Sequence, residues 1–526
     1  MQDDGSAIER EVTAKAPVGE AGGPSILARA ALGMGWIVAW RMATRVLGLV
    51  NTLVLIRLLA PADFGLVALG TSFILAIDTL STIGVEDALV REHTPTAAMY
   101  DTAFTMAALR SLATTLIIAV AAIPIAAFFA EPRLAHILWA LAAGTLIAGI
   151  GSIGVVDFRR DMAFEKEFLL QILPRLVSIS VSIGTALIWH SYWALVAGIL
   201  TGRIVRTLFG YRMHSWRPRF TLSAWRDLIG FSLWIWAISL TELVRDRMDM
   251  FVLGRVLSPT AVGVYAIGDE VAFLPSTEVV APLCRACFSA FAAARRAGQD
   301  VGEAFMRPVA TTFLITFPAG LGISLVADPL VHLIMGEKWI AAIPIIEMLG
   351  IIGALNVFGL VASTLLSAHA LLRPQFSITL ICLGLRFALL ILLVRRFGIA
   401  GAAIGCVLGV VFEHSMFMVV VFRQFALSVA ELVRRIWRTI AAGLIMAVVL
   451  ITTGLGWSHI AGDITRLTLV LTTAVVVGAA VYTAALLALW WLSGRPRGAE
   501  ADGLAVVVRL VRSLIGRRRP VGPELM

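Results

Sequence analysis

Charged side chains recur inside long apolar segments of this chain. The segment at 228–254 carries Glu242, Arg245, Asp246 and Asp249. Their spacing of three and four residues places them on one face of a helix. A charge at bilayer depth costs about 2.5–3.5 kcal/mol even on the lenient insertion scale. Because this cost must be offset, the stripe indicates either a polar cavity or a set of ion pairs between helices.

Arginines in other apolar segments indicate what such a cavity would bind. Arg41 and Arg45 lie one helical turn apart, Arg175 follows Pro174, and Arg386 lies in the middle of its segment. Guanidinium groups bind phosphate oxygens in a planar, bidentate way and stay charged at physiological pH. We therefore predict an anionic substrate. The predicted substrate-binding residues are Arg41, Arg45, Arg175, Arg245, Arg247 and Arg386.

Carboxylates in the same segments suit a second role. They could carry the protons or sodium ions that drive a transport cycle, or they could pair with the arginines. The predicted residues for these roles are Glu242, Asp246, Asp249, Asp269, Glu270 and Glu278. The structural alternative is that the charges form ion pairs or that arginines snorkel to the interface. We favour that alternative for Arg110, Glu347, Glu413 and His414, and it stays open for Arg41 and Arg45.

The composition shows which elements must position these residues. The chain has 526 residues, of which 59% are hydrophobic and only 15% charged, with a mean hydropathy of +0.91. A soluble protein of this length needs more polar surface. The composition therefore predicts an all-α membrane protein with many crossings. The net charge of +9 then reflects orientation and contact with anionic inner-leaflet lipids, and no binding of nucleic acid is expected.

Apolar runs near the ~20 residues that a bilayer requires predict about 14 transmembrane helices. They are 36–56, 64–90, 102–129, 134–156, 168–188, 192–211, 228–254, 261–290, 308–330, 340–366, 375–394, 398–422, 439–457 and 465–492. Loops that follow the even-numbered spans are richer in Arg and Lys than the opposite loops. The positive-inside rule therefore places both termini in the cytoplasm.

An internal repeat organises these spans. The stretch Arg57–Gly70 recurs as Arg255–Gly268, with the Arg, one Leu, the Pro, two Gly and one Ala at matching positions. The copies follow spans 1 and 7, so an even number of crossings separates them and both run the same way. This predicts two six-helix bundles in a parallel repeat around a central cavity. The spans at 439–457 and 465–492 form two additional C-terminal helices.

The repeat also predicts the division of the chain. We expect a disordered cytoplasmic N-terminus, two bundles, a pair of extra transmembrane helices, and a basic cytoplasmic tail with an amphipathic helix at 503–519. The boundaries are 1–30, 31–215, 216–425, 426–494 and 495–526.

Several short motifs, in this order and spacing, carry a resemblance to a known family. They are Leu58–Gly65, Asp249–Arg255 with Gly263–Tyr265, Asp269 to Arg285, and Gly336–Trp339. Over residues 30–425 the chain resembles the polysaccharide transporter family of the multidrug/oligosaccharidyl-lipid/polysaccharide flippase superfamily. The resemblance implies twelve core helices around a cavity, two more helices, and alternating access coupled to an ion gradient. It also implies a substrate of undecaprenyl-pyrophosphate carrying an oligosaccharide.

We therefore expect an inner-membrane flippase for exopolysaccharide or lipopolysaccharide synthesis, with no enzyme activity, cofactor or metal. Expected partners are the lipid-linked oligosaccharide, inner-leaflet lipids, and a polysaccharide polymerase and export machinery; the protein itself is expected to be monomeric. The alternatives are a lipid II-type flippase and a cation-coupled drug exporter, although arginines argue against the latter. A membrane-embedded polymerase or ligase would need a large outer loop, and the predicted outer loops are short.

Overall fold

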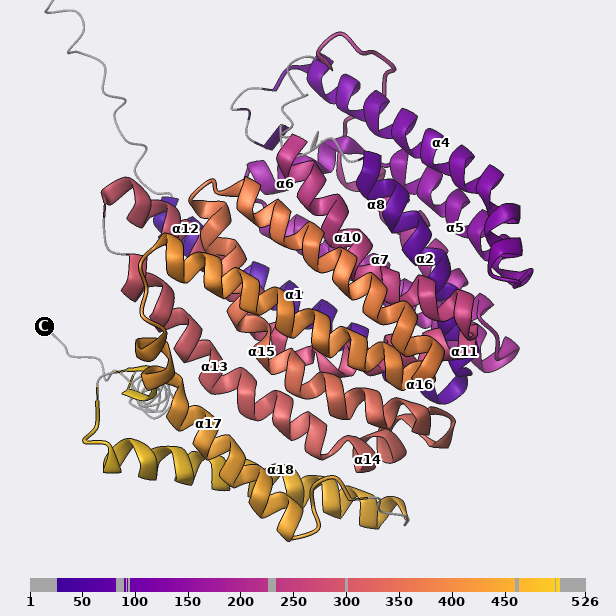
Figure 1. Ribbon diagram of the computed structural model, residues 1–526. Helices are drawn as coiled ribbons and strands as arrows, with labels where there is room; N and C mark the ends of the chain where they lie inside the picture. The colour runs from indigo at the N-terminus through magenta and orange to yellow at the C-terminus, as the bar shows by residue number, and fades with distance from the viewer. Residues whose placement is uncertain are drawn as a thin grey trace, which may run out of the picture.

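The protein is a stack of long helices that run roughly alongside one another (Figure 1). The computed structural model describes residues 26–81, 89–90, 92, 95–225, 233–298, 301–458, 463–496 and 498–501. Every regular element within these ranges is helical. Most of the predicted N-terminal segment and the predicted amphipathic helix at 503–519 lie outside the described residues.

The helices of the first part of the chain are α1 (Ile26–Leu58), α2 (Pro61–Ser81), α4 (Ala97–Phe128), α5 (Arg133–Gly149), η1 (Ile153–Val156), α6 (Asp157–Arg160), α7 (Phe164–Trp189) and α8 (Trp193–Met213). Those of the second part are α10 (Leu233–Val256), α11 (Pro259–Ala272), η2 (Ser276–Val280), α12 (Ala281–Ala297), α13 (Val301–Leu325), α14 (Ala327–Leu330), η3 (Val331–Met335), η4 (Glu337–Ala342), α15 (Ile343–Ala368), α16 (Leu372–Gln424), α17 (Val429–Thr452) and α18 (Ile464–Leu492). Each of the predicted spans overlaps at least one of these helices.

The helices establish a multi-pass membrane protein. Ten helices in the described residues are long and apolar enough to cross a bilayer, and up to 11 if a bent pair after α4 forms one span. The charge-bearing α10 is not among the ten. Helix α16 counts once, although its backbone turns at Gly398, where φ is 61°, between two predicted spans. The exact number of crossings and the two-bundle arrangement remain predictions.

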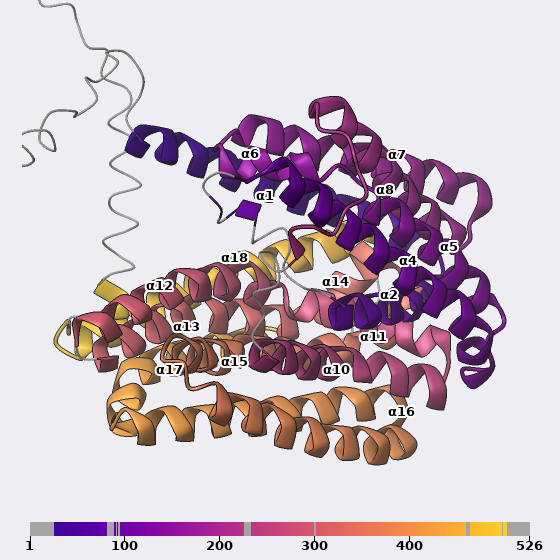
Figure 2. The ribbon, with the colours of Figure 1, turned by 90° about the horizontal axis from the view of Figure 1, so that it is seen from above.

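The two copies of the repeat lie against each other. Helices α2 and α11 begin at the repeated prolines, Pro61 and Pro259, and pack together (Figures 1 and 2). A Cβ atom added to Gly65 would lie 1.8 Å from the carbonyl oxygen of Pro259. A Cβ atom added to Gly263 would lie 1.8 Å from the carbonyl oxygen of Pro61. The two helices therefore touch backbone to backbone in a reciprocal contact that admits only glycine.

A distant segment covers this crossing. Arg57, at the end of α1, donates a hydrogen bond to a carbonyl oxygen of η3. The indole Nε1 of Trp339 donates to the carbonyl oxygen of Ile56 at 3.1 Å, and its ring meets Phe64 edge-on at a centroid distance of 5.4 Å. Gly336 has a φ of +88°, which favours glycine. The family-like stretches around Pro61 and Trp339 therefore meet at one end of the molecule, here called the α2–α11 end.

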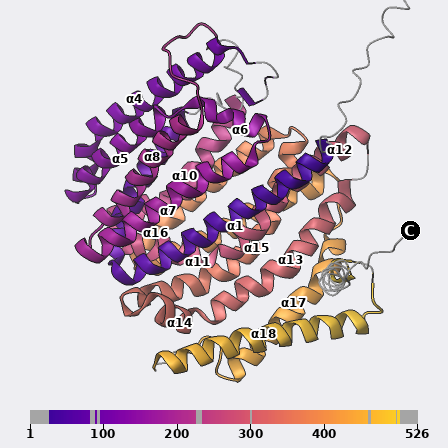
Figure 3. The same ribbon diagram turned by 180° about the vertical axis from the view of Figure 1, so that it is seen from behind.

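Helices α17 and α18 lie at one edge of the helix stack, away from the crossing (Figure 3). They pack on each other, and α17 also packs on α13. The hydroxyl of Tyr482 in α18 donates to the carbonyl oxygen of Leu314 in α13 at 2.7 Å. That the two helices stand outside a duplicated pair of bundles stays a prediction.

The crossing yields a test of its geometry. We expect Gly65→Ala and Gly263→Ala each to lower the melting temperature of the purified protein in detergent, because the new methyl group must force the helices apart. Overpacking of this kind costs about 1–3 kcal/mol. Gly184→Ala in α7 is the matched control, since nothing lies within 4 Å of its added Cβ. Equal melting temperatures for the three variants would contradict the reciprocal contact.

Candidate functional site

A cavity of about 910 Å³ opens between α1, α7, α8 and the η2–α12 segment. Six of its lining residues are arginines and one is acidic. The charged lining consists of Arg41, Arg45, Arg175, Arg203, Arg206, Arg285 and Glu278. We call this space the arginine cavity. Figure 3 shows α1 running across this side of the molecule, with α7 beside it.

Local sequence explains how the arginines reach the cavity. Arg41 and Arg45 are four residues apart on α1, so they share a helix face. Arg175 follows Pro174 in α7 and extends across to α1. A Cβ atom on Gly48 would lie 2.8 Å from the Nη2 atom of Arg175, so glycine makes room for the guanidinium group. Two helices therefore deliver three of the predicted residues to one space.

Most of these guanidinium groups have no carboxylate partner among the residues that the structure describes. The Nε atom of Arg45 lies 2.7 Å from Glu278 Oε1, which makes an ion pair without hydrogen-bond geometry. This is the one ion pair recorded for the arginine cavity within the described ranges. Arg203 donates to the neutral Leu141 carbonyl at 3.2 Å and to Thr145 Oγ1 at 2.8 Å. The cavity thus carries an excess of positive charge that water or an anionic ligand must balance.

A second cavity, of about 490 Å³, lies between α10, α11, α15 and α16. It contains both signs of charge, and we call it the paired cavity. Its charged residues are Glu242, Arg245, Asp246, Arg247, Asp249, Asp269, Arg386 and Glu413. Thr277 of η2 lines both this cavity and the arginine cavity, so the two spaces meet there.

Two ion pairs dominate the paired cavity, one buried and one half-buried at its arginine. Arg386 Nη2 lies 2.5 Å from Asp249 Oδ2, which also accepts a hydrogen bond from the Tyr265 hydroxyl at 3.0 Å. Arg245 Nη1 lies 2.5 Å from Glu413 Oε1. Arg386, Asp249 and Glu413 are 8%, 4% and 4% exposed. These arginines differ from those of the arginine cavity because carboxylates neutralise them within the protein.

Some polar atoms of the paired cavity remain unsatisfied. Asp249 Oδ1, Arg386 Nε and Arg247 Nε are buried and make no hydrogen bond to any residue that the structure describes. Asp269, one helix away on α11, lines the same space. A buried carboxylate oxygen without a partner is costly. The space beside Asp249 could therefore accept a proton, a cation or a water molecule.

The structure divides the predicted site residues into three groups. The arginine cavity receives Arg41, Arg45, Arg175 and Glu278. The paired cavity receives Arg245, Arg247, Arg386, Glu242, Asp246, Asp249 and Asp269. Glu270 is exposed on α11 and lines neither cavity. The functional roles of all these residues remain predictions.

Three lining arginines were absent from the predicted substrate-binding set. Arg203 and Arg206 lie three residues apart in an apolar segment, so the spacing that selected the α10 stripe could also have selected them. Arg285 lies in the charged stretch of α12. Arg110 and Glu413, for which structural ion pairs were expected, lie 3.5 Å from Asp78 and 2.5 Å from Arg245 respectively.

Two proteins of polysaccharide biosynthesis are similar to this chain in sequence. The lipopolysaccharide biosynthesis protein WzxC of Escherichia coli (strain K12) is 25% identical over 338 residues, which are 63% of this chain and 68% of that protein. The succinoglycan biosynthesis transport protein ExoT of Rhizobium meliloti (strain 1021) is 23% identical over 321 residues, which are 60% of this chain and 65% of that protein.

A solved structure shares the fold. The lipid II flippase MurJ, in an inward closed conformation, matches with a TM-score of 0.70 at 12% identity, over 86% of this chain and 98% of that one. The family model described as "Polysaccharide biosynthesis protein" matches residues 54–344, which are more than half of the chain. The protein therefore belongs to the polysaccharide biosynthesis protein family, in agreement with the resemblance seen in its sequence.

Proposed function

We propose that the protein flips an oligosaccharide linked to undecaprenyl pyrophosphate from the cytoplasmic to the periplasmic leaflet of the bacterial inner membrane. The flipped unit would serve exopolysaccharide or lipopolysaccharide synthesis. The observation that carries the proposal is the arginine cavity, where six guanidinium groups face one carboxylate. Such a space suits an anionic headgroup, and pyrophosphate supplies oxygens for several bidentate contacts.

The pyrophosphate would bind in the arginine cavity rather than in the paired cavity. Arg41, Arg45 and Arg175 would contact it, because no carboxylate holds Arg41 or Arg175 within the described part of the chain. Arg245 and Arg386 would instead position α10 and α16 through Glu413 and Asp249. The Arg45–Glu278 contact joins α1 to η2, so a phosphate that takes over Arg45 would also loosen this contact.

The paired cavity would serve ion coupling. Asp249 presents an unpartnered oxygen there, and Asp269 and Glu242 line the same space. An anionic headgroup that leaves a cytoplasm at negative potential gains about 2.3 kcal/mol per charge per 100 mV. The electrical step thus favours export, and ion binding at Asp249 would drive the return of the empty carrier.

We further propose 14 crossings in two six-helix bundles plus α17 and α18, with both termini in the cytoplasm. Support comes from the overlap of every predicted span with a helix and from the reciprocal contact of the repeats. In this orientation the α2–α11 end is periplasmic. Arg45 lies twelve residues before Arg57, or about 18 Å at 1.5 Å per residue, so the arginine cavity lies on the cytoplasmic side of a closed outer end.

A lipid II-type flippase is the second candidate. The solved structure that shares the fold is a lipid II flippase, and its name implies a lipid substrate. Both candidates would use the same cavity. A cation-coupled drug exporter fits less well, since a cavity lined by six arginines and one carboxylate repels cations. Deletion of the gene separates the first two: accumulation of a lipid-linked oligosaccharide supports the proposal, and accumulation of a cell-wall precursor supports the second candidate.

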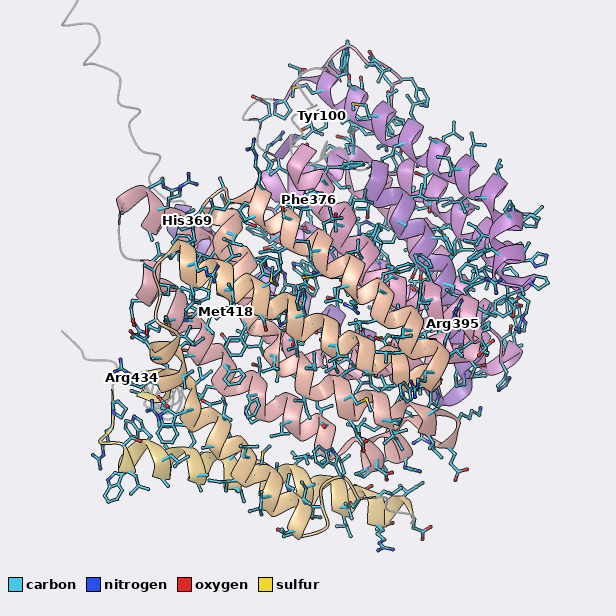
Figure 4. All side chains as sticks on the ribbon, viewed as in Figure 1. Tyr100, His369, Phe376, Arg395, Met418 and Arg434 are labelled. Atoms are coloured by element: carbon cyan, nitrogen blue, oxygen red, sulfur yellow. The ribbon has the colours of Figure 1, made fainter. Side chains whose placement is uncertain are left out.

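Replacement of a cavity arginine tests the pyrophosphate contact. We expect Arg175→Ala to reduce flipping of a lipid-linked oligosaccharide in proteoliposomes by at least about tenfold, because a charge-assisted hydrogen bond contributes about 1.5–3 kcal/mol. Arg395→Ala is the matched control. Arg395 is exposed on α16 near the bend at Gly398 (Figure 4). It lines neither the arginine cavity nor the paired cavity. Equal losses in the two variants would count against a pyrophosphate site at Arg175.

Replacement of the Arg386–Asp249 pair tests its positioning role. We expect Arg386→Met to lower the melting temperature strongly, because breaking a buried pair costs about 3–5 kcal/mol. The double variant with Asp249→Leu should recover much of the loss, since neither charge then remains unpaired. The measurement is thermal melting of the purified protein. If Arg386→Met melts like the wild type but no longer flips substrate, Arg386 binds substrate directly and our division of roles is wrong.

A further inference from the structure

A third cavity, of about 380 Å³, lies within the first part of the chain, among α2, α4, α5, η1 and α8. We call it the side cavity. Arg203 and Arg206 of α8 line both this space and the arginine cavity. These two side chains are therefore the shared wall between the two spaces. A group bound to the arginine cavity could extend past them into the side cavity.

The side cavity is basic and polar. Arg110, Arg203 and Arg206 line it together with a single carboxylate, Asp78. Arg110 Nη1 lies 3.5 Å from Asp78 Oδ1. Arg203 donates to neutral acceptors of α5, and the described residues place no carboxylate within ion-pair distance of it, so Asp78 acts on it only at longer range. Among the described residues that line this space, three arginines therefore accompany one carboxylate.

A buried hydroxyl adds an independent indication of a ligand. Ser152 lines the side cavity, is only 6% exposed, and its Oγ atom makes no hydrogen bond to any described residue. Buried hydroxyls usually have a partner. An oxygen-rich ligand in this cavity would supply one. No aromatic side chain lines the space, so the face of a neutral sugar would find no ring to stack on.

We propose that the side cavity binds an acidic sugar of the substrate, with Arg110 and Arg203 holding its carboxylate while the pyrophosphate remains in the arginine cavity. The proposal rests on the flippase function and specifies its substrate: the oligosaccharide carries a carboxylate close to its reducing end. Arg110 lines the side cavity and not the arginine cavity, so it would distinguish acidic from neutral sugars without contacting the pyrophosphate.

A matched pair of ligands tests the proposal. UDP-glucose and UDP-glucuronic acid share a pyrophosphate and differ at one sugar carbon, which bears a hydroxyl in the first and is a carboxylate in the second. We expect the purified full-length protein to bind UDP-glucuronic acid at least about tenfold more tightly, as measured by titration calorimetry. Arg110→Gln should bring the ratio of the two dissociation constants toward one. Asp78→Asn should increase it, because Arg110 loses its competing carboxylate.

The variants separate recognition from a structural role. A structural role for the Arg110–Asp78 pair predicts that both variants change the preference in the same direction, and that result would overturn the proposal. Arg175→Ala should weaken both ligands and keep their ratio, and Arg395→Gln should change neither affinity. Equal binding of the two ligands by the wild type, or binding of inorganic pyrophosphate alone, would overturn the acidic-sugar site but not the flippase. Failure of all three ligands to bind would count against the pyrophosphate site itself.

Discussion

A guanidinium group at the depth of a bilayer must find either a carboxylate or water, and this structure depends on that constraint. In the paired cavity the constraint is met within the protein, because Asp249 and Glu413 lie 2.5 Å from the arginines that they neutralise. In the arginine cavity, where six arginines and one glutamate line the space, the guanidinium groups instead face an open volume that water can fill. The difference separates a space that holds helices in place from a space that can accept an anion, although both contain the same residue type.

The reciprocal contact of α2 and α11 determines where that open space can be. Gly65 and Gly263 bring the two repeats into backbone contact at one end, and Trp339 and Arg57 secure the same end. Because α2 and α11 touch at this end, the helices around them can separate only toward the opposite end of the molecule. The arginines of α1 precede this closed end by several helical turns, so they line the separated part. The repeated segments thus form the contact at this end, and the proposed substrate space lies beyond it.

The sequence predicts the helices and most of the charged residues that line the two cavities. Both the length of an apolar run and a spacing of three or four residues are local signals. It also marks the two glycines of the contact, since they recur with their prolines, but only the structure shows that they meet. It could not predict which charges pair. Arg386 and Asp249 are far apart in the sequence, and only the packing of α10 on α16 brings them together. For the same reason the sequence could not show that Arg203 lines two cavities and that Glu270 lines neither the arginine cavity nor the paired cavity.

Site-specific crosslinking tests the central claim, that unpaired arginines rather than paired ones receive the pyrophosphate. A photoreactive amino acid would replace Gln171 in the arginine cavity or Ser363 in the paired cavity. The purified protein would then be irradiated with an undecaprenyl-pyrophosphate oligosaccharide labelled with 32P. The account predicts labelled protein from position 171 and little from position 363. Strong labelling at 363 without labelling at 171 would place the phosphates among the paired charges and contradict it.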